Sequence, residues 1–248
     1  GTRGAFVAAP IGDNQAGFLG ATADPIHTVL VNIGTSGQVS TLVDPESDYA
    51  ADVPSGIDQR PFPGGRRLWV GAILTAGKAF GLLADLVRHI DRLMHGSETV
   101  DPFVVLDSAM RDQRSPSPLS VATQFAGTRE NPDRNGSIGG IRLDNFTLTE
   151  LYYGIVHGIV DELAVHWDRI IAATRSGDRS SRFPTNLVGS GTALHRSAPL
   201  RSAIEDRFGM SLDTTHRAET SADGAAVLAY APLAGTDAET AAATLVSR

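Results

Sequence analysis

The sequence has 248 residues, of which 42% are hydrophobic and 20% are charged, and its formal net charge is −7. A chain of this size and composition can bury a sizeable core, as soluble globular proteins do. The acidic balance argues against a nucleic-acid partner, because phosphate backbones require clustered Lys and Arg. The absence of cysteine excludes disulfides and thiolate metal sites, and it fits a cytoplasmic location.

The apolar runs, the first residue and the lysine content give three further observations. Its apolar runs are too short to span a bilayer, so we expect no membrane partner. The sequence begins at Gly1 without an initiator methionine, which indicates a piece of a longer protein. Lys78 is the only lysine, which biased codon usage explains most simply.

The first part of the chain predicts strands and one hairpin. Apolar or β-branched runs predict strands at residues 6–11, Thr28–Ile33 and residues 38–43. The last two runs flank a glycine-containing break at residues 34–37, which predicts a β-hairpin. A short helix is expected at residues 15–21, and the polar, proline-rich residues 44–63 predict a surface excursion.

The rest of the chain predicts helices that alternate with short strands. Residues 68–94 contain a long helical stretch, residues 96–118 read as a mixed loop, and residues 127–141 read as an ordered loop. The clearest helix follows Thr147, which forms a capping-box pattern with Glu150. After a charged turn, further strands are expected at residues 186–188 and 210–214, with helices at residues 200–208, 222–230 and 237–246. This order favours an α/β fold.

Four segments combine turn glycines with groups suited to phosphate or proton chemistry. They are residues 12–15, residues 34–37, the pair Gly71 and Gly77, and residues 189–192. Glycine lets backbone N–H groups approach phosphate oxygens, and an acceptor hydroxyl needs a carboxylate such as Asp13 to take its proton. Each segment alone is weak evidence for a functional site. Residues 34–37 could be only a hairpin loop, and Asp13 could be only a helix N-cap. No P-loop pattern is present.

Taken in order, these motifs resemble the C-terminal half of the FGGY carbohydrate kinases. Gly12-Asp-Asn-Gln-Ala16 resembles the family's acid segment, and Val31-Asn-Ile-Gly-Thr-Ser-Gly37 resembles its phosphate hairpin. Phe125-Ala-Gly-Thr-Arg129 resembles the loop before its central helix, and Leu187-Val-Gly-Ser-Gly191 resembles its adenosine motif. The form of the acid segment and the Val-Asn-Ile-Gly run are most similar to sedoheptulokinase-like members.

The resemblance implies an actin-like ATPase (RNase H-like) α/β domain, with a mixed β-sheet flanked by helices. Residues 1–248 would form the nucleotide-binding domain of a kinase, and the N-terminal sugar-binding domain would be missing from this chain. The implied activity is ATP-dependent phosphorylation of a hydroxyl on a ketose or polyol such as sedoheptulose, with Mg²⁺. Without its other half, the chain should bind nucleotide poorly and catalyse nothing.

The resemblance also implies roles for individual residues. Asp13 would be the catalytic base, and Asp13, Asn14 and Gln15 would contact the sugar. ATP would be bound by Gly34, Thr35, Ser36, Gly37, Gly77, Gly189, Ser190, Gly191 and Thr192. No metal ligand is assigned to the protein, and the match around Gly77 is loose.

Alternatives remain open at this point. A non-catalytic nucleotide-binding module of the actin-like superfamily would need no base at Asp13, and a degenerate remnant would bind nothing. Arg129 could meet phosphate or anchor its loop to a carboxylate, and His157 and Trp167 read as packing residues. The sequence leaves the oligomeric state open, with a homodimer as one alternative.

Overall fold

The computed structural model describes residues 7–44, 52–112, 114, 118–176, 184–215 and 219–246. Its centre is a six-stranded mixed sheet with the strand order β3-β4-β2-β1-β7-β8. The strands are β1 (Thr28–Ile33), β2 (Gly37–Val43), β3 (Ile57–Pro61), β4 (Arg67–Ile73), β7 (Asn186–Ser190) and β8 (Leu212–Thr214). Strands β1 to β4 pair antiparallel, whereas β7 is parallel to β1 and β8 is parallel to β7. The predicted mixed α/β fold is therefore confirmed.

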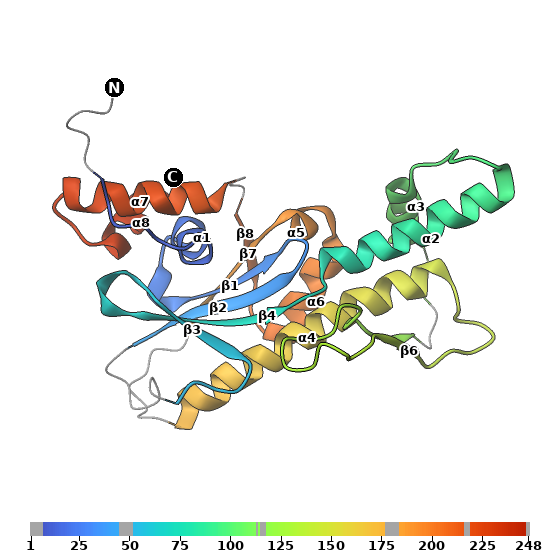
Figure 1. The fold of residues 1–248 in the computed structure, drawn as a ribbon, viewed down its shortest axis with the longest axis horizontal. Coiled ribbons are helices and arrows are strands. Elements are labelled where there is room, and N and C mark those ends of the chain that lie inside the picture. The colour runs from blue at the N-terminus through green and yellow to red at the C-terminus, as the bar shows by residue number, and fades with distance from the viewer. Residues whose placement is uncertain are drawn as a thin grey trace.

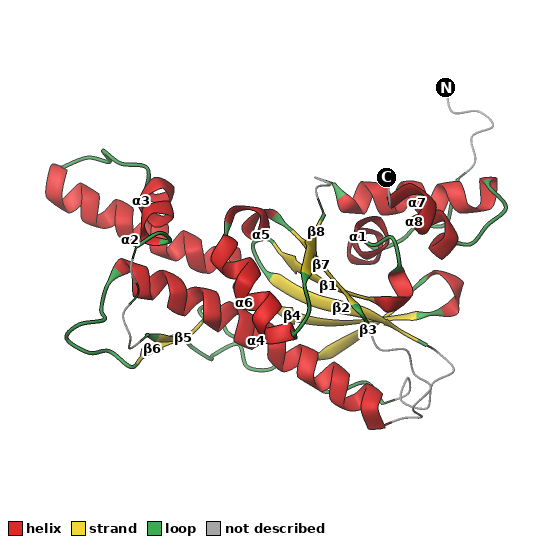
Figure 2. Cartoon of the chain, turned by 180° about the vertical axis from the view of Figure 1, so that it is seen from behind, coloured by secondary structure: helices red, strands yellow, loops and turns green. Residues whose placement is uncertain are grey.

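Helices cover both faces of this sheet, as Figures 1 and 2 show. One face is covered by α1 (Asp13–Ala21), α7 (Thr220–Leu233) and α8 (Ala238–Val246), and the other by α4 (Leu148–Ser176) and α6 (Ala198–Phe208). Helices α2 (Gly77–His95) and α3 (Pro102–Ala109) extend beyond the end of the sheet. The remaining elements of the described residues are α5 (Thr192–Arg196), the small ladder of β5 (Ser120–Ala122) with β6 (Ser137–Gly139), and the 3-10 turns Pro25–His27 and Pro63–Gly65.

The strand side chains divide into two cores with the two-residue period of a pleated strand. In β4, Trp69 and Ile73 join the core under α4, while Leu68 and Val70 join the core under α1 and α7. Because both faces are buried, β1 and β4 read as continuous apolar runs and show no polar alternation.

Several predicted elements match the structure. Strand β1 has the predicted bounds, the hairpin with β2 is antiparallel, and the short helix α1 begins two residues before the predicted start. The N-cap of α4 is confirmed, since the Glu150 N–H donates to Thr147 Oγ1 over 3.2 Å. Gly209 closes α6 in the left-handed region with φ 67°.

Other expectations were wrong. Residues 7–11 of the predicted first strand have no regular structure; Val7 is 86% exposed, and Pro10 lacks the N–H that a strand ladder needs. The predicted surface excursion contains the edge strand β3, whose outer side pairs with no strand of the described residues and therefore tolerates polar residues. The predicted mixed loop contains α3, which Asp101 caps by accepting from the Phe103 N–H over 2.8 Å.

Two further expectations concern the long helical stretch and the charged turn. Strand β4 was missed, because only Leu74, Thr75 and Ala76 separate its apolar run from α2 and periodicity alone cannot divide the two. Of the predicted charged turn, Arg175 and Ser176 belong to α4, and residues 177–183 lie outside the described part of the chain.

Candidate functional site

The turn between β1 and β2 is docked onto the start of α2. The Gly77 N–H donates to Gly34 O over 2.9 Å, and the N–H groups of Ala76 and Lys78 donate to Thr35 O over 3.2 Å each. A Cβ at Gly77 would overlap Gly34 O and lie 3.2 Å from its carbonyl carbon. Only glycine allows this close approach of two backbones.

The turn after β7 lies against the same end of β1. Because β1 and β7 are parallel neighbours, with Asn32 opposite Ser190, their carboxyl ends meet at one edge of the sheet. Gly191 has φ 98°, and a Cβ there would stand 2.6 Å from the carbonyl carbon of Ile33 and 3.0 Å from Asn32 Oδ1. A residue with a side chain would be both strained and crowded at this position.

These turns open onto a cavity of about 670 Å³, which we call the nucleotide cavity because residues predicted to bind nucleotide line it. Four of the residues predicted to bind nucleotide line it: Gly34, Thr35, Gly77 and Thr192. Of the other predicted nucleotide residues, Gly37, Gly189, Ser190 and Gly191 do not line it: Gly37 begins β2, Gly189 and Ser190 end β7, and Gly191 is the N-cap of α5. Ser36 lines a second cavity.

Other lining residues of the nucleotide cavity were missed by sequence reasoning. Phe80 and Tyr152 supply aromatic surface, with ring centroids 5.2 Å apart, and the exposed cations Lys78 and Arg196 lie at the cavity. Only Lys78 carried a signal, because it is the single lysine of the sequence and directly follows Gly77. Aromatic surface beside backbone N–H groups and cations suits a ligand with a flat ring and phosphates.

Asp13 lines a second cavity of about 360 Å³, which we call the acid cavity. Its lining is mainly polar and includes Asn14, Asn32, Ser36, Gln38, Arg60 and Ser221. Gly34 lines both cavities, so one glycine turn separates the carboxylate from the nucleotide cavity.

Of the three residues predicted to contact the sugar, Asp13 and Asn14 line the acid cavity and Gln15 does not. Asn14 lines the acid cavity and donates from Nδ2 to Gln38 Oε1. Gln15 does not line that cavity, and its Nε2 donates to Pro61 O over 3.4 Å. Asp13 is the first residue of α1, and the N-cap is Gly12, so Asp13 is not the helix cap that the alternative interpretation required.

The position of Asp13 depends on a close crossing of α1 with α7. A Cβ at Gly20 would stand 2.5 Å from the Gly224 nitrogen, and a Cβ at Gly224 would stand 2.6 Å from the carbonyl carbon of Ala16. Ser221 Oγ donates to Asp13 O over 3.0 Å. The start of α1, with its carboxylate, is therefore fixed by α7.

Other residues singled out by the sequence have structural roles. Arg129 pairs with Asp58 of β3, so it anchors its loop to a carboxylate. Trp167 is buried and stacks on Phe208, as expected for a packing residue, whereas His157 is exposed.

The described residues contain neither a self-sufficient metal site nor a helix suited to a membrane span. No group of three or more His, Asp or Glu side chains in this part of the chain could hold a metal ion by itself. Within the same residues, no helix combines the length and apolar character that a membrane span requires.

Comparisons with known proteins place this geometry in a structural context. No protein-family model and no curated protein matches the chain. Among solved structures, a xylulose kinase from Rhodospirillum rubrum matches with a TM-score of 0.71 and 19% identity over 92% of this chain and 43% of its own. A xylulose kinase from Brucella ovis matches with a TM-score of 0.70 and 19% identity over 93% of this chain and 44% of its own.

A glycerol kinase from Plasmodium falciparum, solved with ADP, matches with a TM-score of 0.70 and 18% identity over 96% of this chain and 45% of its own. The chain thus spans less than half the length of the carbohydrate kinases it resembles in structure. Its fold is that of the matching part of these solved kinases.

Proposed function

We propose that this chain is the C-terminal, nucleotide-binding half of a two-domain kinase that transfers a phosphoryl group from ATP to a hydroxyl of a ketose or polyol. The observation that carries the proposal is the pair of adjoining cavities that share Gly34, with a carboxylate in one and glycine turns in the other. Phosphoryl transfer needs this arrangement, because the acceptor hydroxyl must lie in line with the terminal phosphate.

In this reaction, Asp13 accepts the proton of the acceptor hydroxyl while that oxygen forms a bond to the terminal phosphorus. The bond from this phosphorus to the bridging oxygen breaks, ADP leaves with the electron pair, and Asp13 releases its proton to solvent. Asp13 is exposed in the acid cavity and therefore reachable by an acceptor.

The nucleotide cavity would hold ATP through three kinds of contact. The turn at Gly34 and Thr35, with Gly77, would lie along the phosphates, and Lys78 would add a positive charge. Thr192 would face the adenosine, and the glycine turn before it would hold Thr192 in place without lining the cavity. Bound Mg²⁺ would neutralise phosphate charge; the lining offers one carboxylate, Asp107, which fits an ion held largely by phosphates and water.

The missing half would supply the other wall of the acid cavity and most sugar contacts. We therefore expect the isolated chain to be inactive, and sedoheptulose is the first acceptor to examine. A non-catalytic nucleotide-binding module would need no exposed carboxylate beside the nucleotide cavity.

The test is phosphorylation of sedoheptulose, xylulose, ribulose and glycerol by the full-length protein with Mg²⁺ and ATP, compared with Asp13→Asn. We expect turnover of at least one acceptor by the wild type, no turnover by the variant, and similar ATP affinity for both. ATP binding without phosphorylation of any acceptor would support the binding module. Turnover by the variant would remove Asp13 from the base role.

A further inference from the structure

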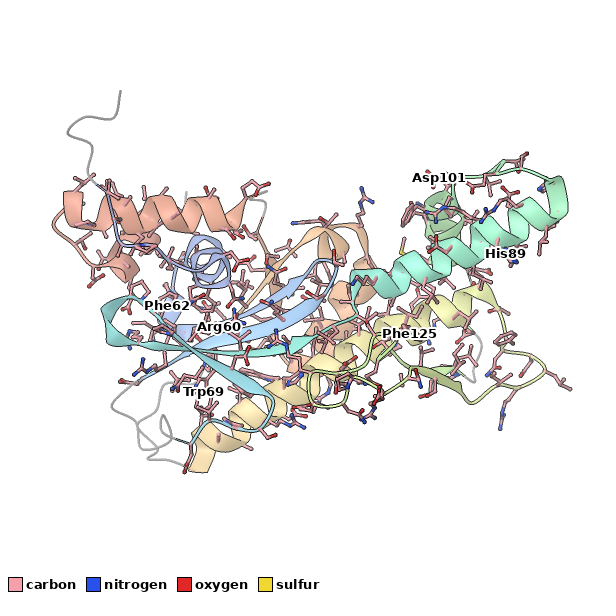
Figure 3. The ribbon with its side chains drawn as sticks, in the orientation of Figure 1. Arg60, Phe62, Trp69, His89, Asp101 and Phe125 are labelled. Carbon is pink, nitrogen blue, oxygen red and sulfur yellow. The ribbon has the colours of Figure 1, made fainter. Side chains whose placement is uncertain are left out.

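The acid cavity contains one cationic side chain that neither the resemblance nor the proposed reaction uses. Among its lining residues only Asp13 and Arg60 are charged, and the other polar ones carry amides or hydroxyls. Arg60 stands on β3 opposite Leu68 of β4, and Leu68 faces the core under α1. Figure 3 shows Arg60 and Phe62 on this side of the sheet, with Trp69 toward α4.

Arg60 is fixed by a chain of ion pairs that starts in a distant loop. Arg60 Nη2 donates to Asp58 Oδ2 over 3.1 Å, and Arg129 donates to the same oxygen over 2.5 Å. Partial burial acts to raise the pKa of Asp58, but its hydrogen bonds to the two guanidinium groups outweigh this and lower it. Asp58 therefore stays ionised, and it orients a guanidinium whose side chain is only 26% exposed.

The remaining donors of Arg60 are available to a ligand. A guanidinium has five N–H donors in a rigid planar fork. Within the described part of the chain, Asp58 is the one side chain that accepts from Arg60. A half-buried cation with unused donors, beside the proposed base, is suited to an oxygen of the acceptor.

The geometry of the fork selects among acceptor oxygens. Two parallel N–H groups match a planar carbonyl or carboxylate oxygen, which offers in-plane lone pairs, better than they match a hydroxyl. The neighbouring amides and hydroxyls of Asn14, Asn32 and Ser36 suit a chain of sugar hydroxyls. The cavity thus combines one planar-oxygen site with several hydroxyl sites.

We propose that Arg60 binds a carbonyl or carboxylate oxygen of the acceptor, so that the site selects ketoses or aldonates over alditols. This inference rests on the proposed function and narrows its substrate class. Asp58 and Arg129 are positioning residues in this account, because they act on the acceptor through Arg60.

The experiment uses the full-length protein as wild type, Arg60→Gln and Arg60→Lys. The matched control is Arg207→Gln, since Arg207 also pairs with an aspartate, Asp168, but lines neither cavity. Acceptors are compared in pairs that differ in the planar oxygen: xylulose with xylitol, and gluconate with glucitol. We measure KM and kcat for each acceptor, KM for ATP, acceptor binding by calorimetry, and thermal melting of every variant.

For Arg60→Gln we expect KM for the preferred planar-oxygen acceptor to rise by roughly 10- to 100-fold, as for loss of a hydrogen bond to a charged group. KM for its alditol should change less than about 3-fold on the same reasoning, because hydroxyl contacts are kept. KM for ATP should be unchanged, Arg60→Lys should recover part of the loss, and Arg207→Gln should behave as wild type. A loss with xylulose would identify a carbonyl as the group that Arg60 binds, and a loss with gluconate would identify a carboxylate.

Equal losses for both members of each pair, or no loss, would overturn the inference while the kinase function stands. If the wild type phosphorylates no acceptor, the proposed function fails. Acceptor binding measured by calorimetry then tests separately whether Arg60 binds the planar oxygen. Weaker binding of the planar-oxygen acceptor to Arg60→Gln, with unchanged binding to Arg207→Gln, would support the role of Arg60. If no acceptor binds the wild type, both proposals fall.

Discussion

The crossing of α1 and α7 gives a prediction with two linked readouts. Replacing Gly224 by alanine would place a methyl group 2.6 Å from the carbonyl carbon of Ala16 and still closer to its oxygen. Both partners are helix backbone, so no flexible side chain can move aside, and α7 must shift away from α1. Because Ser221 of α7 bonds to Asp13 O over 3.0 Å, the start of α1 should shift with it.

The expected magnitudes follow from this geometry. Overpacking of this kind costs about 1–3 kcal/mol, while alanine in a helix gains about 1 kcal/mol over glycine. Gly81→Ala in α2 is the matched control, because a Cβ there meets nothing within 4 Å. The difference between the two variants isolates the crowding term of about 1–3 kcal/mol. A shift of Asp13 on the order of 1 Å should lower kcat by about 10²-fold.

The assay is urea unfolding of the full-length protein, together with kcat and KM for ATP with whichever acceptor it phosphorylates. KM for ATP should be the same for Gly224→Ala as for the wild type, because α1 and α7 do not line the nucleotide cavity. Equal unfolding midpoints for Gly224→Ala and Gly81→Ala would refute the proposed crowding. A destabilised Gly224→Ala with unchanged kcat would refute the claim that this crossing positions Asp13.

Three further predictions concern other parts of the fold. Gly191→Val should raise the Kd for ATP, because a Cβ at φ 98° crowds the end of β1; an unchanged Kd by calorimetry would contradict this. Asp91 accepts hydrogen bonds first of all from Thr99, and these hold its pKa far below the ordinary value of 3.8. Since the folded-state pKa is the lower one, its stabilisation is present above about pH 4 and is lost as the pH falls. The gap in urea midpoint between wild type and Asp91→Asn should therefore shrink in acid, and a gap independent of pH would exclude this. Thr147→Ala removes the N-cap of α4 and should cost about 0.5–2 kcal/mol in urea unfolding; wild-type stability would show that the cap is dispensable.

Elements with strong local signals were predictable from the sequence. Strand β1 is β-branched, α4 begins at a capping threonine, and α6 ends at a glycine, so each carries its own start or stop signal. Strands β3 and β4 carry none: β3 is polar, which its place at the sheet edge allows, and only three residues separate the apolar run of β4 from α2. Their identity depends on pairing with each other and with β2.

The candidate site divides in the same way. Gly34, Thr35, Gly77 and Thr192 were predicted from motifs built on turn glycines, and all four line one cavity. Tyr152, Phe80 and Arg196 were missed, since an aromatic residue or arginine on a helix looks the same in sequence whether it faces a cavity or the solvent. Gln15 was grouped with Asp13 because both belong to the motif that carries the resemblance, yet successive helix positions point about 100° apart, and its side chain turns to Pro61.

The sequence by itself determined the α/β class, the hairpin, the main helices and the order of the glycine turns, because these depend on local backbone preferences and hydrophobic periodicity. Only the tertiary structure decided that Gly34 separates the two cavities, that α7 holds Asp13 in place, and that Arg60 of the edge strand joins Asp13 in the acid cavity. These relations link residues far apart in the chain, and only strand pairing and helix packing bring them together.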